Sequence, residues 1–227
     1  ADGANMLADA LEPYDGIVMW RAFVYAPNSP DRANQAYDEF MPLDGEFRDN
    51  VLIQIKNGPV DFQPREPFSP LFGGMSKTAM MVEFQITQEY MGGSNHLVYL
   101  STQLEECLDS DTHCDNEYST VAEITSGKAY PEVYNTTAIA GVANIGRDKN
   151  WCGHYFAQSS WYAFGRLAWN AELSSEEIAR EWLQQTFSTE PEFVEPVLDM
   201  MMTSRETAVD YMMPLGLHHI FAGGHHY

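Results

Sequence analysis

Four short apolar segments, each ending in polar residues, recur along the chain and predict the strands of an α/β fold. The predicted strands are residues 17–24, 51–56, 79–85 and 139–145. The first three begin roughly thirty residues apart, which is the length of a repeated strand–helix unit. The pattern therefore favours a sheet of parallel strands with helices between them.

The remaining segments carry helical signals. Asp31 is placed to cap a helix that begins near it, because its carboxylate would accept hydrogen bonds from the next backbone amides. Ser174 and Glu177 have the spacing of a capping box and predict the start of another helix. Further helices are predicted at residues 97–108, 151–170 and 194–213.

Polar side chains on one face of the predicted strands distinguish two α/β architectures. Gln54 and Lys56 share one face of the second strand, and Glu83 follows the same alternation in the third. A doubly wound sheet is apolar on both faces, whereas a (β/α)8 barrel has polar groups at the carboxyl ends of its strands. Four strands do not close a barrel. We therefore predict the C-terminal half of a (β/α)8 TIM barrel in residues 1–170 and the start of an all-α domain in residues 171–227.

The charge balance excludes some partners. The chain has 33 Asp and Glu residues against 12 Lys and Arg residues, a net charge of -21. Such a surface repels nucleic acids, and no apolar run reaches the ~20 residues that span a bilayer. Two of the few cations, Arg21 and Lys56, lie in or at the end of predicted strands. Either they pair with core carboxylates or they form an anion pocket.

Two carboxylates are candidates for catalysis. Asp61 and Glu89 each follow the carboxyl end of a predicted strand, so both would reach one pocket at the mouth of a barrel. Hydrolysis of an acetal uses two carboxyl groups in this way. Alternatively, Asp61 caps a loop and Glu89 is a surface acid. Glu83 lies deeper in its strand, where pairing with a cation from a neighbouring strand is the simpler interpretation.

Histidine and cysteine patterns predict neither a metal site nor a cofactor. The histidines near the C-terminus form two adjacent pairs, His218-His219 and His225-His226. Adjacent side chains point apart in extended chain, and no Cys or acidic residue shares their spacing, so hydrogen bonds or sugar contacts are expected instead. The three cysteines lack a CxxC pattern, and a bridge between Cys107 and Cys114 stays an open alternative.

Four motifs are long and unusual enough to carry a family resemblance. They are Ile-Lys-Asn-Gly-Pro-Val-Asp-Phe-Gln-Pro-Arg-Glu-Pro at residues 55–67, Thr-Gln-Glu-Tyr at 87–90, Gly-Val-Ala-Asn-Ile-Gly-Arg-Asp-Lys-Asn-Trp at 141–151 and Gly-Leu-His-His-Ile-Phe-Ala-Gly-Gly-His-His-Tyr at 216–227. With them the chain resembles the microbial xylan α-glucuronidases of glycoside hydrolase family 67 over essentially all of its length. The resemblance implies a chain that starts before the fifth strand of the barrel and stops inside the helical C-terminal domain.

The resemblance also implies a reaction. The family removes 4-O-methyl-glucuronic acid, α-1,2-linked to the terminal xylose of xylo-oligosaccharides, with inversion. By motif, Asp61 and Glu89 match the carboxylates that activate the attacking water, and Arg21 and Lys56 match cations that hold the uronic carboxylate. The family's general acid lies on a strand upstream of residue 1. The resemblance therefore implies that this chain alone is inactive, and that the full-length protein is a homodimer.

Two other functions stay open, and so does the localisation. One alternative is a non-catalytic carbohydrate-binding protein built on a degenerate barrel. The other is a barrel glycosidase for neutral sugars, in which Arg21 and Lys56 would form structural ion pairs. Members of the family occur in the cytoplasm, the periplasm and outside the cell, and the sequence does not decide among them.

Overall fold

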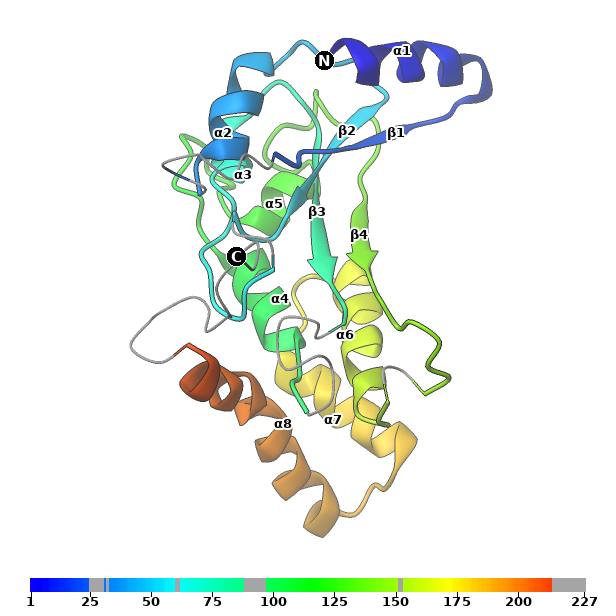
Figure 1. Cartoon of the computed structure of the whole chain (residues 1–227), viewed down its shortest axis with the longest axis vertical. Helices are drawn as coiled ribbons and strands as arrows, with labels where there is room; N and C mark the ends of the chain where they lie inside the picture. The colour runs from blue at the N-terminus through cyan, green and yellow to red at the C-terminus, as the bar shows by residue number, and fades with distance from the viewer. Residues whose placement is uncertain (25–30, 32, 60–61, 88–96, 151–152, 214–227) are drawn as a thin grey trace. The chain divides into compact units, whose positions relative to one another are not determined.

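The computed structural model describes residues 1–24, 31, 33–59, 62–87, 97–150 and 153–213. Its centre is a four-stranded sheet in the order β1-β2-β3-β4 (Figure 1). The strands are β1 (Val18–Arg21), β2 (Val51–Lys56), β3 (Met80–Gln85) and β4 (Ile139–Val142). β1 is parallel to β2, and β2 is parallel to β3. The predicted α/β class with a parallel sheet is confirmed, while its identity as half of a (β/α)8 barrel and the all-α domain stay predictions.

The chain divides into two compact units. The first comprises Ala1–Phe62, Glu66–Phe84 and Cys107–Ala140, and the second comprises Gln63–Arg65, Gln85–Glu106 and Gly141–Tyr227. Each unit therefore contains segments that are distant in sequence. The predicted domain boundary after residue 170 stays a prediction.

Short helices surround the strands of the first unit. They are α1 (Asp2–Leu11), α2 (Gln35–Phe40), α3 (Leu71–Gly74) and α5 (Val121–Thr125), with 3-10 turns at Glu12–Tyr14 and Met41–Leu43. The sequence pattern did not predict α1, which contacts β1 and β2 and buries only the small side chains of Ala4 and Ala8. The carboxylate of Asp31 accepts hydrogen bonds from the amides of Ala33 and Asn34, but α2 begins at Gln35 with Asn34 as its N-cap, so Asp31 stabilises the turn before the helix and is not its cap.

Strand boundaries follow the prediction in the middle of the sheet and deviate at its edges. β2 spans the predicted residues, whereas β1 and β4 end earlier than expected. β1 ends at Arg21 because the amide of Phe23 turns back and donates to the carbonyl of Arg21 at 2.9 Å. This three-residue turn is common where strands end.

One face of the sheet is apolar towards the amino ends of the strands. There, Leu52 of β2 and Met81 of β3 pack with Ala79 against partly buried residues that include Val133 and Tyr134. Side chains two positions further along a strand lie on the same face. The next residues on this face are Gln54 and Glu83, so the face becomes polar towards the carboxyl ends, as the sequence predicted.

Helices form most of the described part of the second unit. After α4 (Ser101–Asp109), which begins there, come α6 (Ala157–Trp169), α7 (Ser175–Thr186) and α8 (Pro191–Met212). α7 contacts both α6 and α8. Its start carries the predicted capping box, since the amide of Glu177 donates to the hydroxyl of Ser174 and the amide of Ser174 donates to the carboxylate of Glu177. In the described part of the chain, no helix has the length and apolar character needed to cross a membrane.

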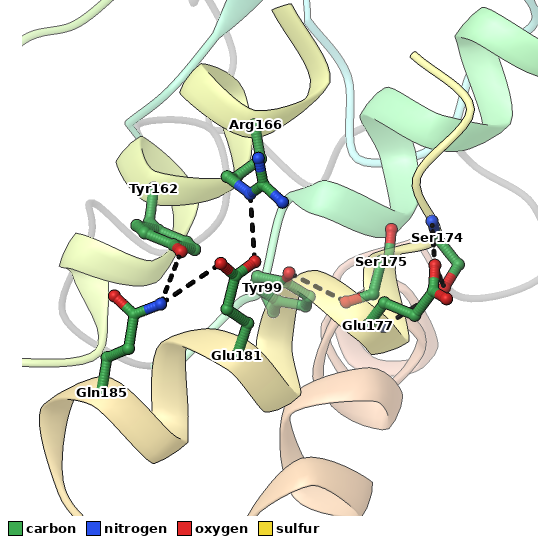
Figure 2. A network of polar contacts seen from close by, with 8 residues as sticks. All are labelled: Tyr99, Tyr162, Arg166, Ser174, Ser175, Glu177, Glu181 and Gln185. Carbon is green, nitrogen blue, oxygen red and sulfur yellow. Dashed lines mark hydrogen bonds and ion pairs between the residues drawn. The ribbon is translucent and has the colours of Figure 1, made fainter. Parts of the chain in front are cut away.

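Aromatic and polar contacts hold the helices of the second unit together. The ring of Trp182, almost fully buried, lies 5.6 Å from the ring of Phe156 and 5.4 Å from that of Phe187, measured between centroids. Figure 2 shows a polar network between α6 and α7, in which Glu181 of α7 accepts a hydrogen bond from Arg166 of α6 at 3.0 Å. Stacked and edge-on aromatic contacts favour the packing of α7 beyond simple burial.

Candidate active site at the carboxyl ends of the strands

Arg21 and Glu83 form a bidentate ion pair on the polar part of the sheet. Nε of Arg21 lies 2.8 Å from one carboxylate oxygen of Glu83, and Nη2 lies 2.5 Å from the other. The Glu83 side chain is fully buried, whereas 44% of the Arg21 side chain is exposed. The amide of Gln54, on the strand between them, also donates to Glu83 at 2.5 Å. The expectation that a core carboxylate pairs with Arg21 is confirmed.

Lys56 lies against two aromatic rings. Only 8% of this residue is exposed. Its Nζ atom lies 4.1 Å from the centroid of the Phe23 ring and 5.1 Å from that of the Phe62 ring. The guanidinium carbon of Arg21 lies 5.5 Å from the same Phe23 centroid. Cation–π attraction thus places both predicted cations around one ring.

The sequence prediction missed both phenylalanines. Phe23 follows Arg21 by two positions, so the alternation of a strand would have placed it on the same face. Its apolar type concealed the contact, because an aromatic residue after a strand usually predicts core packing. Phe62 follows Asp61 directly, and no periodicity in the sequence links it to Lys56.

The loop after β2 has a strained residue next to the predicted catalytic position. Phe62 is buried and has a φ of 63°, a left-handed conformation that is uncommon for a residue other than glycine. At the base of the loop, the amide of Ser69 donates to the carbonyl of Asn57 at 2.9 Å. Residues held in such conformations cluster at active sites and ligand clamps.

Several residues with a predicted functional role lie outside the described part of the chain. These include both catalytic candidates, Asp61 and Glu89, and the two histidine pairs. Among the described residues, no group of three His, Cys, Asp or Glu side chains is arranged to hold a metal ion. Cys107 and Cys114 carry thiols and not a disulfide, so the open alternative of a bridge between them does not hold.

A cleft at the opposite end of the sheet is a separate feature. It has a volume of about 640 Å³ and is lined by residues that precede β1 and β2, including Asp9, Asp15 and Arg48. Arg48 donates to Asp9 at 2.8 Å, and this hydrogen bond lowers the pKa of the Asp9 carboxyl. The amino ends of strands are usually associated with stability in α/β barrels, whereas ligands bind at the carboxyl ends.

The fold and the polar cluster define a class of protein. A parallel α/β sheet with cations and a carboxylate grouped at the carboxyl ends of its strands belongs to the α/β proteins that bind ligands at this edge. Residues 1–151 match the glycosyl hydrolase family 67 middle domain, and residues 152–227 match the glycosyl hydrolase family 67 C-terminus. The chain therefore belongs to glycosyl hydrolase family 67, which confirms the resemblance seen in its motifs.

Curated relatives agree with the family. The chain is 46% identical over 225 residues to alpha-glucuronidase A of Emericella nidulans, and 44% identical over 222 residues to alpha-glucuronidase of Hypocrea jecorina. A probable alpha-glucuronidase A of Aspergillus fumigatus is 45% identical over 223 residues. Each alignment covers 96% of this chain and 26% of the relative. The chain thus spans about a quarter of the length of these relatives.

Proposed function

We propose that this chain supplies part of the active site of an inverting α-glucuronidase. The substrate is a xylo-oligosaccharide that carries glucuronic acid, or its 4-O-methyl form, α-1,2-linked to the terminal xylose. Family membership carries the proposal, since relatives 41–46% identical to this chain are named α-glucuronidases. The cluster of Arg21, Lys56 and Glu83 supports it, because a uronic acid needs local cations in a protein with a net charge of -21.

Arg21 and Lys56 bind the carboxylate of the uronic acid in this proposal. A guanidinium has five N–H donors. Among the described residues, Glu83 takes the donors on the Nε and Nη2 side of Arg21, which leaves the Nη1–Nη2 edge for a second carboxylate. Arginine suits such paired recognition because its donors match the two oxygens of a carboxylate. Lys56 adds a second positive charge, so the trio with Glu83 has one positive charge in excess.

Asp61 and Glu89 activate the attacking water in the same proposal. An inverting glycosidase keeps its acid and its base roughly 6.5–9.5 Å apart, which leaves room for this water. The general acid is assigned to no residue of this chain, and the chain alone is expected to be inactive. The full-length enzyme is proposed to act as a homodimer and without a cofactor.

The test uses the full-length enzyme that carries this sequence. Asp61→Ala and Glu89→Ala are each expected to lower kcat about 10²–10⁴-fold on the glucuronosylated substrate, the usual range for removing a general base. Glu12→Ala, at the amino-end cleft, is the matched control and should leave kcat unchanged. Full activity of both active-site variants would remove these residues from the mechanism.

Product analysis separates the remaining functions. Inversion at an α-linked sugar releases the β anomer first, which proton NMR detects before mutarotation; early release of the α anomer would contradict an inverting mechanism. Binding without any release of sugar would favour a carbohydrate-binding protein. Cleavage of plain xylo-oligosaccharides at an equal rate would favour a glycosidase for neutral sugars.

A further inference from the structure

Glu83 lies on β3, one strand from Lys56 on β2 and two strands from Arg21 on β1. It is opposite Lys56 in the register of β2 and β3, and it reaches across β2 to pair with Arg21. Its carboxylate accepts two hydrogen bonds from Arg21 and one from Gln54. Two cations and one carboxylate therefore lie on three adjacent strands, although the residues beside Glu83 in its own strand, Val82 and Phe84, are buried and apolar.

The grouping of two cations with one carboxylate has an electrostatic consequence. Arg21 and Lys56 both lie within 5.5 Å of the centroid of the Phe23 ring, so two like charges share a small volume. Like charges that are close together repel, and more strongly where water is excluded. The buried carboxylate of Glu83 compensates this repulsion and allows both cations to face one ligand.

Glu83 also restricts the orientation of Arg21. An arginine side chain that is nearly half exposed has many rotamers, and ordering it on binding costs free energy. A bidentate pair with a buried carboxylate fixes the plane of the guanidinium before the ligand arrives. The remaining donor edge of Arg21 then has a defined direction.

We propose that Glu83 is a positioning residue for uronate recognition: it orients Arg21 and offsets the repulsion between Arg21 and Lys56, and thereby sets the preference of the site for a carboxylate over a neutral group. The inference rests on the proposed function, because it takes Arg21 as a ligand of the uronic acid. It adds a residue that does not itself touch the substrate.

The experiment compares two inhibitors of the full-length enzyme. D-glucuronate and D-glucuronamide differ only in the charge of the group that Arg21 is proposed to bind. In Glu83→Gln, the inhibition constant of glucuronate should rise about tenfold while that of glucuronamide changes less than about twofold, because one charge-assisted interaction is weakened. KM for the natural substrate should rise with it, and kcat should change much less.

A double-mutant cycle tests the route through Arg21. In an Arg21→Met background, Glu83→Gln should have little further effect on the inhibition constant of glucuronate, because the effects of substitutions in one network are not additive. Equal weakening of both inhibitors by Glu83→Gln would indicate a general structural role and overturn the inference. If Glu83→Gln does not fold, Glu83→Asp replaces it, because it keeps the charge but loses the paired geometry. Inhibition by glucuronate should then again weaken more than inhibition by glucuronamide.

The outcomes also separate the two proposals. A wild-type enzyme that binds glucuronate no better than glucuronamide would overturn the proposed function and this inference together. If the preference for glucuronate over glucuronamide is lost in Arg21→Met but kept in Glu83→Gln, the inference alone would be overturned.

Discussion

The hydroxyl of Tyr99 offers a sharp test of the packing in the second unit. It donates to the carbonyl of Ser175 at 3.0 Å, and both residues are fully buried. Figure 2 shows this contact at the start of α7. Tyr99→Phe keeps the ring and removes this one hydrogen bond. A buried intramolecular hydrogen bond contributes about 0.5–1.5 kcal/mol, so the free energy of unfolding should fall by that amount.

Urea denaturation followed by circular dichroism measures this loss. Tyr162→Phe is the matched control, because its hydroxyl accepts a hydrogen bond from Gln185 at 3.1 Å in an exposed position. Removing that hydroxyl should change the free energy of unfolding by less than about 0.5 kcal/mol. Equal stability of Tyr99→Phe and the wild type would refute the reasoning.

The pH dependence of the same pair of proteins gives a second check. Burial raises the pKa of Tyr99 above its ordinary value of 10.0. The folded state thus favours the protonated phenol, and this contribution is fully present below pH 10 and is lost as the pH rises through the folded pKa. The difference in the free energy of unfolding between the wild type and Tyr99→Phe should therefore become smaller above pH 10.

Three further predictions concern single contacts. Ser174→Ala removes the cap of α7 and should lower the free energy of unfolding by about 1 kcal/mol, measured by thermal or urea unfolding. An unchanged free energy of unfolding would contradict this. Hydrogen bonds from Ser174 lower the pKa of Glu177 below its ordinary value of 4.5. The ionised carboxylate therefore stabilises the folded state above pH 4.5, and this stabilisation is lost as the pH falls through the lowered pKa. The melting temperatures of the wild type and Glu177→Gln should converge on acidification, and a constant difference would contradict this. Arg205, 4% exposed, donates to the carbonyl of Pro64 at 3.1 Å and pairs with Glu106. Arg205→Met should destabilise the protein by about 2–3 kcal/mol, and a smaller loss than in Ser174→Ala would argue against it.

Sequence patterns predicted those parts of the fold whose contacts join residues close together in the sequence. The run from Val51 to Lys56 became a strand at the predicted residues, because a short, mostly apolar run rich in Val and Ile favours a buried strand. The capping box of Ser174 and Glu177 formed for a similar reason, since all its donors and acceptors lie within four residues. α1 escaped prediction because Ala4 and Ala8 give a weak apolar signal, and its burial comes from contact with β1 and β2.

The sequence by itself determined the order of the four strands along the chain, the face on which Gln54, Lys56 and Glu83 lie, and the family to which the chain belongs. Each of these follows from residue type and spacing along the chain. Only the tertiary structure decided that Glu83 pairs with Arg21, 62 residues away, and that Phe23 lies beside both cations. Alternation along a strand indicates the face on which a side chain lies. The stagger between strands and the turn after β1 determine which side chains meet on that face.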